Sequence, residues 1–155
     1  MKISLKESLA LETIEKVVLN SYEQSLYLVS IINDGEERFV TDEKGNFLYD
    51  EVKIDDSFSQ AHALHFADLN GDGVDELITG KRVYGHNGRD PGADDVPVVM
   101  YYTWDKKFKT IRKHVAAKGA GIGLHIVTAD LDADGDLDIV VPGKEGTQIL
   151  WNKRK

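Results

Sequence analysis

The chain has 155 residues, which is enough for one ordinary domain or two very small ones. It carries 19 Lys and Arg against 27 Asp and Glu, a formal net charge of −8, which argues against nucleic-acid binding because phosphate contacts need clustered basic side chains. It has no cysteine, which excludes disulfides and thiolate metal sites. We expect no membrane span and no secretory signal, because no sufficiently long apolar run is present, and the sequence leaves the native compartment unknown.

The first fifty residues predict a short helix followed by a small antiparallel meander of three or four strands. The helix is expected at residues 4–11, where Ser4 is a candidate N-cap with Glu7 three residues later. Three segments rich in β-branched and aromatic residues follow, TIEKVVL, SLYLVSIIN and ERFVT, and the last two are bounded by the turn signals NDGE and DEKGN. Residues 1–48 resemble a short uncharacterised bacterial domain, and nothing in them indicates chemistry.

The polar segment YDEVKIDDSFSQ (residues 49–60) predicts a boundary between a region at 1–50 and a region at 51–155. Superposing Asp68 on Asp130 aligns LHFADLNGDGVDELITGK with IVTADLDADGDLDIVVPGK. Each unit then reads as a strand, an acidic loop, a strand, a turn and a further strand (VPVVMYYTW and TQILWN), which is typical of a repeat protein. The two repeats cover about residues 57–110 and 118–155. The change of texture near residue 50 also permits a fusion of unrelated parts.

The two acidic loops carry oxygen-bearing side chains at alternate positions around a glycine turn. Counted from the first aspartate, positions 1, 3, 5 and 9 offer side-chain oxygens, and position 6 is Gly73 or Gly135. Six to eight oxygens in flexible geometry are what calcium takes, and magnesium is the second candidate because it demands stricter geometry. The predicted ligands of two calcium sites are Asp68, Asn70, Asp72 and Glu76, then Asp130, Asp132, Asp134 and Asp138, with the backbone carbonyls of Val74 and Asp136 at position 7.

Two other interpretations of these loops are an EF-hand and a turn that holds no metal. An EF-hand shares the opening of the motif but needs a bidentate Glu at position 12 and long flanking helices, whereas position 12 is Thr79 or Val141 and the flanks are strand-like. Turns rich in Asp, Asn and Gly that hold no metal are the remaining alternative. The occurrence of two matching loops in the same strand context favours cation sites.

Both loops with their flanking strands resemble the FG-GAP or VCBS repeat family, whose members are blades of seven-bladed β-propellers. The resemblance implies a mainly β fold with two propeller-type blades, each stiffened by calcium bound to the residues named above. A closed propeller has typically four to eight blades. Two blades would leave open sheet edges, so we expect a longer natural context, self-association through those edges, or a meander that covers one of them.

A narrower resemblance covers residues 57–152 and rests on GKR…GHNGRDPG and GAGIGLH. These strings are similar to the propeller domain of the aldos-2-ulose dehydratase family, which implies elimination of water from an oxidised sugar with help from a divalent ion. Histidine can transfer protons near neutral pH, and a Lys or Arg can stabilise an enolate-like intermediate. The candidate catalytic residues are His62, Lys81, Arg82, His86 and His125, each of which could instead be a packing or turn residue.

Three functions therefore follow from the sequence. The leading one is a calcium-dependent repeat module, structural or in contact with a protein or glycan partner. The alternative is a lyase, a dehydratase acting on a sugar-derived carbonyl compound. The third is an interaction scaffold in which the N-terminal meander docks a partner.

Overall fold

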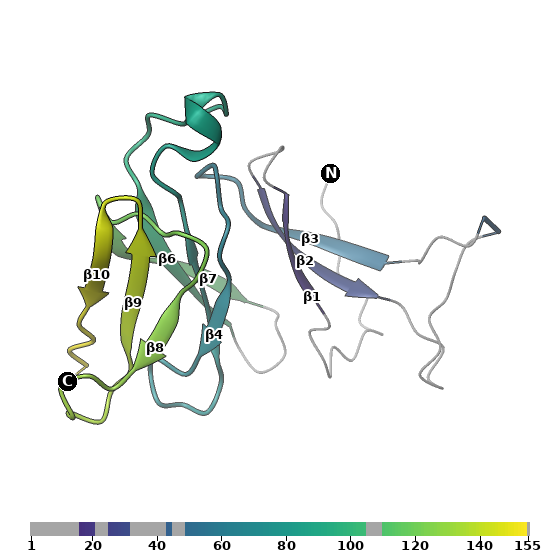
Figure 1. Cartoon of the computed structure of the whole chain (residues 1–155). Helices are drawn as coiled ribbons and strands as arrows, with labels where there is room; N and C mark the ends of the chain where they lie inside the picture. The colour runs from purple at the N-terminus through teal and green to yellow at the C-terminus, as the bar shows by residue number, and fades with distance from the viewer. Residues whose placement is uncertain (1–15, 21–24, 32–42, 45–48, 105–109, 155) are drawn as a thin grey trace.

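The chain is mainly β in the computed structural model, which describes residues 16–20, 25–31, 43–44, 49–104 and 110–154. Ten strands form three antiparallel sheets (Figure 1), and within these residues none of the sheets closes into a barrel. The mainly β prediction is confirmed. The helix predicted at 4–11 and the strand predicted at 37–41 lie outside the described residues. No helix among the described residues is long and apolar enough to cross a membrane.

The N-terminal sheet has the order β1-β2-β3, with β1 at Lys16–Asn20, β2 at Ser25–Ile31 and β3 at Tyr49–Asp55. β1 overlaps the predicted strand segment TIEKVVL and ends one residue beyond it, and β2 falls within the segment SLYLVSIIN. β3 lies in the polar segment that the sequence marks as a boundary, and it pairs with β2 along its length. Val52 and Ile54 alternate there with charged residues, the period of a strand that has one apolar face.

The second sheet has four strands in the order β4-β5-β6-β7. Its central strand β5 (Glu76–Gly80) is buried along its whole length between β4 (His65–Ala67) and β6 (Val98–Trp104). β7 (Ile111–Lys118) completes the sheet as an edge strand. Its sequence, IRKHVAAK, is largely polar and was not predicted to form a strand. The sheet pairs β6 with β7 from Val98↔Lys118 to Trp104↔Ile111, apart from an irregularity between Val99 and Met100.

The third sheet repeats the strand–loop–strand arrangement of the second. It has the order β10-β9-β8, with β8 at Val127–Ala129, β9 at Asp138–Gly143 and β10 at Gly146–Leu150. The register is the same in both units, since Ala67 pairs with Glu76 and Ala129 with Asp138. In each unit the acidic loop connects the first two strands of the sheet, so the sequence repeat is also a structural repeat.

The four-stranded sheet is covered on both faces. One face shares a hydrophobic core with the third sheet, and the other packs against the chain that follows β3. The shared core contains Ala63, Ala67, Leu69, Ile78, Val99, Ala120, Ile122, Ile126, Ile139 and Val141. The second cluster consists of Leu77, Met100 and Tyr102, with Ile54, Phe58 and Leu64 packed against it. Burial of this kind stabilises a fold by about 25 cal/mol per Å² of apolar surface.

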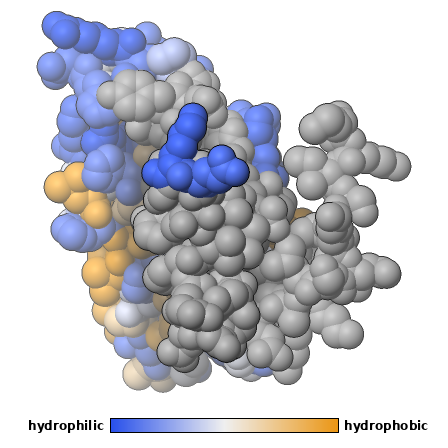
Figure 2. Space-filling model, turned by 90° about the vertical axis from the view of Figure 1, so that its right-hand side faces the viewer, coloured by the Kyte–Doolittle hydropathy of each residue, from blue (hydrophilic) through white to orange (hydrophobic). Residues whose placement is uncertain are grey.

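Between β5 and β6 the chain makes a long excursion that includes the 3₁₀ turn η1 (Gly85–Gly88), at one end of the molecule (Figure 1). Three non-glycine residues there, Tyr84, His86 and Asn87, have φ between 46° and 56°. Such left-handed conformations are uncommon outside glycine and are often found at functional sites. The same end of the molecule is hydrophilic in the view of Figure 2, whereas hydrophobic residues gather lower along one side.

Candidate functional site

The two acidic loops have the same backbone conformation. At position 4 of each loop φ is positive, 73° at Gly71 and 59° at Ala133. At position 6 it is positive again, 82° at Gly73 and 90° at Gly135. Glycine adopts this conformation without steric cost, whereas Ala133 takes it with a side chain attached. The turn is therefore retained even where the residue type differs.

The first aspartate of each loop accepts hydrogen bonds from the backbone that wraps around it. Asp68 Oδ1 accepts from the N–H groups of Gly71 (2.7 Å) and Asp72 (3.1 Å), and its Oδ2 accepts from Gly73 (2.9 Å). Asp130 accepts from Asp134 (3.1 Å) and Gly135 (3.0 Å) in the same way. The N–H of Gly73 is the largest influence on the pKa of Asp68, which is held below its ordinary value. Both carboxylates thus face the interior of their loops.

Position 5 accepts the same backbone hydrogen bond in both loops, whereas the residue type at position 3 differs between them. At position 5, Asp72 accepts the N–H of Val74 at 2.8 Å, and Asp134 accepts the N–H of Asp136 at 3.1 Å. The nearby hydrogen bond from the Asp136 N–H is the largest influence that lowers the pKa of Asp134. At position 3, Asn70 accepts the N–H of Asp72 at 2.9 Å, whereas the equivalent residue of the second loop is the acidic Asp132.

The acidic residue at position 9 is buried in both loops and fastens the loop to the sheet. Glu76 is 2% exposed and Asp138 is fully buried. Glu76 accepts the N–H of Leu69 and the side-chain amide of Asn70, both at 2.8 Å. Burial raises the pKa of Glu76, with a further contribution from the charges of Asp72 and Asp68, although the hydrogen bond from Leu69 opposes the rise. Asp138 accepts the N–H of Leu131 at 3.0 Å.

The C-terminal segment Asn152, Lys153 and Arg154 connects the two loops, which the sequence analysis did not anticipate. The side-chain amide of Asn152 donates to the carbonyls of Leu69 (2.8 Å) and Leu137 (3.2 Å), and its backbone N–H donates to Asp138 (2.8 Å). Lys153 forms ion pairs with Asp132 and Asp134, and Arg154 lies 2.6 Å from Asp136. The available signal was the basic run NKRK directly after the last apolar strand segment.

Three predicted ligands of the second loop come together. One carboxylate oxygen from each of Asp130, Asp132 and Asp138 lies within 4.8 Å of the other two, and among the described residues this is the one such group of acidic or histidine side chains. Oxygens at this spacing could hold a hard divalent cation. In the first loop, Asn70 and Glu76 are hydrogen-bonded to each other instead. The carbonyls of Val74 and Asp136 remain predicted ligands.

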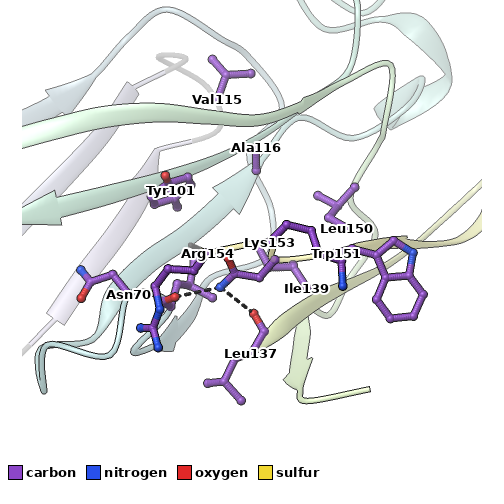
Figure 3. A pocket seen from close by; sticks show the side chains of 12 residues that line it. Asn70, Tyr101, Val115, Ala116, Leu137, Ile139, Leu150, Trp151, Lys153 and Arg154 are labelled. Atoms are coloured by element: carbon purple, nitrogen blue, oxygen red, sulfur yellow. Dashed lines mark hydrogen bonds between the residues drawn. The ribbon is translucent and has the colours of Figure 1, made fainter. Parts of the chain in front are cut away.

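Beside the acidic loops, a groove of about 420 Å³ runs between the second and third sheets. Figure 3 shows Tyr101, Val115 and Ala116 of β6 and β7 on one side, with Ile139 and Leu150 of β9 and β10 on the other. Asn152 also lines the groove, and the dashed lines mark its two hydrogen bonds, to the carbonyls of Leu69 and Leu137. The groove is thus mainly apolar, with the basic C-terminal residues at its rim.

Of the candidate catalytic residues, Lys81 is 1% exposed and held in place. Its ammonium group donates to Gln60 Oε1 at 3.1 Å and to the carbonyls of Arg82 and Ala93, both at 3.2 Å. Burial lowers the pKa of Lys81, although the carboxylates of Asp95 and Asp94 act in the opposite direction. These contacts clamp the two ends of the excursion that contains η1, which is a positioning role.

Arg82 and His86 line one small cavity, and their charges act on His62. Partial desolvation of the His62 ring lowers its pKa, and the charges of Arg82 and then His86 lower it further. His86 Nδ1 lies 2.6 Å from Asp90 Oδ2. His125 is exposed in the segment between Gly123 and β8, directly after Leu124, which lines the same cavity.

Comparison with known proteins adds one finding. A model of a family of unknown function (DUF6482) matches residues 1–63, which is less than half of the chain. The chain is similar to that family over β1 to β3 and the residues just after them, a region that ends before the first acidic loop. No curated protein and no solved structure matches the chain.

Proposed function

We propose that this chain is a calcium-binding repeat module of β-propeller type, in which each acidic loop holds one cation and the sheets serve a structural role or contact a protein or glycan. The observation that supports this most is the repetition of one loop conformation, around two D-x-[DN]-x-D-G sequences, between strands paired in the same register. A turn rich in Asp and Gly that served only as a connection would not need carboxylates facing inward at equivalent positions in both units.

The arrangement of the sheets supports propeller-type blades. The second sheet is a four-stranded antiparallel meander, which is the unit of a propeller blade, and it shares a core with the third sheet. The first strands of the two units also meet, because His65 Nε2 lies 2.9 Å from Thr128 Oγ1. In a propeller the sheets are arranged around a central channel, which would bring equivalent strands together. Within the described part of the chain, β4, β7, β8 and β10 are edge strands, and a second copy of the chain would pair there.

The charge of the loops explains why a cation would stabilise them. The first loop holds four acidic residues and the second holds five, within nine positions each. Lys153 and Arg154 compensate part of the charge of the second loop only. A bound ion would compensate the remainder, so binding and folding would be coupled. Calcium is favoured over magnesium because calcium accepts six to eight oxygens in flexible geometry, whereas magnesium demands near-octahedral coordination.

Thermal unfolding with calcium, with magnesium and with EDTA tests the proposal. Calcium is expected to raise the midpoint most, and Asp72→Ala and Asp134→Ala are each expected to remove part of that rise. Glu145→Ala is the matched control, because it removes an exposed acidic side chain from the β9–β10 turn outside both loops. A midpoint that is the same in calcium and in EDTA would contradict the proposal.

A metal-assisted lyase that acts on a sugar-derived carbonyl compound is the second proposal. The influence of Arg82 and His86 on His62 favours it. One imidazole could remove the proton beside the carbonyl and the other could protonate the leaving hydroxyl, while the guanidinium stabilises the enolate. The test is the ultraviolet absorbance of the conjugated product formed when water leaves a 2-keto sugar. His62→Ala and His86→Ala are expected to abolish it. Loss of turnover in His125→Ala alone would place the chemistry elsewhere.

A further inference from the structure

A small cavity of about 200 Å³ lies at the end of the molecule that carries η1, away from the groove beside the acidic loops. It forms where the start of the excursion between β5 and β6 meets the glycine-rich segment before β8. The residues that line it are Arg82, Val83, Gly85, His86, Ile122, Gly123, Leu124 and Lys144. Its polar side chains are those of Arg82, His86 and Lys144, which are cationic or become so on protonation, although the net charge of the chain is −8.

Arg82 supplies the observation that points to a ligand. Its Nε atom is buried and has no hydrogen-bond partner, and only one other buried side-chain nitrogen or oxygen in the described residues, Gln60 Nε2, shares that condition. Buried polar groups are normally paired, so this unpaired Nε is unusual, and it belongs to the Arg82 side chain that lines the cavity. The orientation of Gln60 is set by its Oε1, which accepts from both Lys81 and the Gly85 N–H.

The other cationic groups are fixed in place by the fold. Lys144 Nζ donates to the Tyr84 carbonyl at 2.6 Å, and His86 is held by Asp90. Gly85 packs so closely on Arg82 that a Cβ there would lie 2.8 Å from the guanidinium. The left-handed backbone of Tyr84 and His86 is the kind of local strain that a surrounding structure maintains at ligand sites. The donors are thus arranged before any ligand arrives.

We propose that this cavity binds a small molecule bearing an oxyanion, a carboxylate or a phosphate group. The guanidinium of Arg82 presents planar paired donors suited to either group, and Lys144 adds a point charge. Val83, Ile122 and Leu124 provide an apolar wall for the carbon skeleton. Since cavities that enclose drug-sized ligands measure about 300–1,000 Å³, this one admits a smaller molecule or a single substituent. The site is separate from the cation loops, and it shares Arg82 and His86 with the lyase proposed above without depending on that chemistry.

The test is a titration of the ¹⁵N-labelled full chain with inorganic phosphate and, separately, with gluconate, at constant ionic strength, after metal has been removed with EDTA and the EDTA has been dialysed away. Saturable shifts of the Gly85 and Gly123 amide signals are expected with at least one of the two probes. Arg82→Gln should weaken that binding about tenfold or more, and Lys144→Gln should weaken it less. Lys118→Gln is the matched control, because it removes the same charge from an exposed position at the end of β7 and should leave the affinity unchanged.

Each outcome is decisive. Binding of phosphate alone assigns the site to phosphate esters, and binding of gluconate alone assigns it to sugar acids or similar carboxylates; either result supports the proposal. Equal weakening in Arg82→Gln and Lys118→Gln would show general charge attraction and overturn it. The absence of saturable shifts with both probes would overturn it as well. If Arg82→Gln does not fold, Lys144→Gln carries the comparison. Because the protein is free of metal, the result does not depend on whether the acidic loops bind calcium.

Discussion

The two strand–loop–strand units have positive φ at the same two loop positions and the same strand register, but they differ in the residues that balance the charge of their loops. In the first loop, Asn70 and Glu76 hydrogen-bond to each other, so part of the compensation is internal. In the second loop, position 3 is the charged Asp132, and Lys153 reaches it from the C-terminal segment. The loop conformation is therefore set by the aspartates and the positive-φ turn that both loops share, whereas the charge balance depends on residues distant in the sequence.

The units also differ in what covers their sheets. The outer face of the first unit packs against Ile54 and Phe58, and Tyr102 donates a 2.6 Å hydrogen bond to Asp55 at the end of β3. The second unit leaves Val127 at 52% and Trp151 at 50% exposed, and the first unit leaves Val115 at 49% exposed. Both units thus present apolar side chains to solvent, but the first is also tied to the preceding segment. The predictions below test these two differences.

The largest effect is expected at Asp55, which distinguishes the first unit from the second. Asp55→Ala would leave the fully buried Tyr102 hydroxyl without an acceptor, which costs about 2–3 kcal/mol of unfolding free energy. Urea denaturation measures this loss. Tyr102→Phe combined with Asp55→Ala should cost less than the sum of the single changes, because no orphaned hydroxyl remains. Strict additivity of the two changes would show that this contact does not link β3 to the sheet.

The stabilisation by Asp55 should depend on pH. Burial alone would raise the pKa of this carboxyl, but hydrogen bonds from Tyr102 and Ser57 and the charge of Lys113 together hold it below its ordinary value of 3.8. The folded state therefore binds the proton less readily than the unfolded state. The contribution is complete above pH 3.8 and is lost as the pH falls through the lowered value. The difference between native protein and Asp55→Ala should stay constant near neutrality and shrink in acid.

A smaller effect is expected from a matched pair of amide substitutions at position 9. Asp138 accepts two backbone N–H groups, from Leu131 and Asn152, so Asp138→Asn would set an amide NH₂ against one of them and cost about 1–3 kcal/mol. Glu76→Gln should cost less, because one of its two donors is the side chain of Asn70, which can rotate. Denaturation in EDTA compares the two variants. A greater loss for Glu76→Gln would mean that the internal compensation of the first loop is the more rigid one.

The sequence was sufficient for those parts of the molecule in which neighbouring residues determine the conformation. Two matching acidic loops between apolar segments predicted β4, β5, β8 and β9, because the motif and the strand period are local. β7 was missed, since IRKHVAAK is polar enough to be mistaken for a connection, and only pairing with β6 makes it a strand. Asn152 was missed for the same reason, because its contact with Leu69 spans 83 positions of the chain.

Asn152 provides the next test, because it is the one side chain that the structure shows bonded to carbonyls beside both loops. Asn152→Ala removes both side-chain hydrogen bonds from a partly buried position and should cost about 1–2 kcal/mol. If Asn152 couples the loops, the effects of Asp72→Ala and Asp134→Ala on the calcium-induced rise in melting temperature should be non-additive in the native chain and additive in Asn152→Ala. Non-additivity of the same size in both backgrounds would assign the coupling to the shared core.

The smallest effect on stability is expected at Lys153, where the comparison between the loops becomes one of cation affinity. Its ammonium group is exposed and pairs with Asp132 and Asp134. Because exposed ion pairs contribute little to folding, the free energy of unfolding of Lys153→Ala in EDTA should be almost that of the native chain. A calcium ion bound by Asp132 would compete with that ammonium group. Removing the ammonium should therefore raise calcium affinity a few-fold at the second loop, more at low salt than at high salt, and leave the first loop unchanged.

Calorimetric titration in an Asp72→Ala background isolates the second loop, with Lys118→Ala as the control for the loss of one positive charge. If Lys153→Ala binds calcium no more tightly than this control, the C-terminal segment does not compete with the ion, and the two loops would differ in charge balance but not in access to a cation.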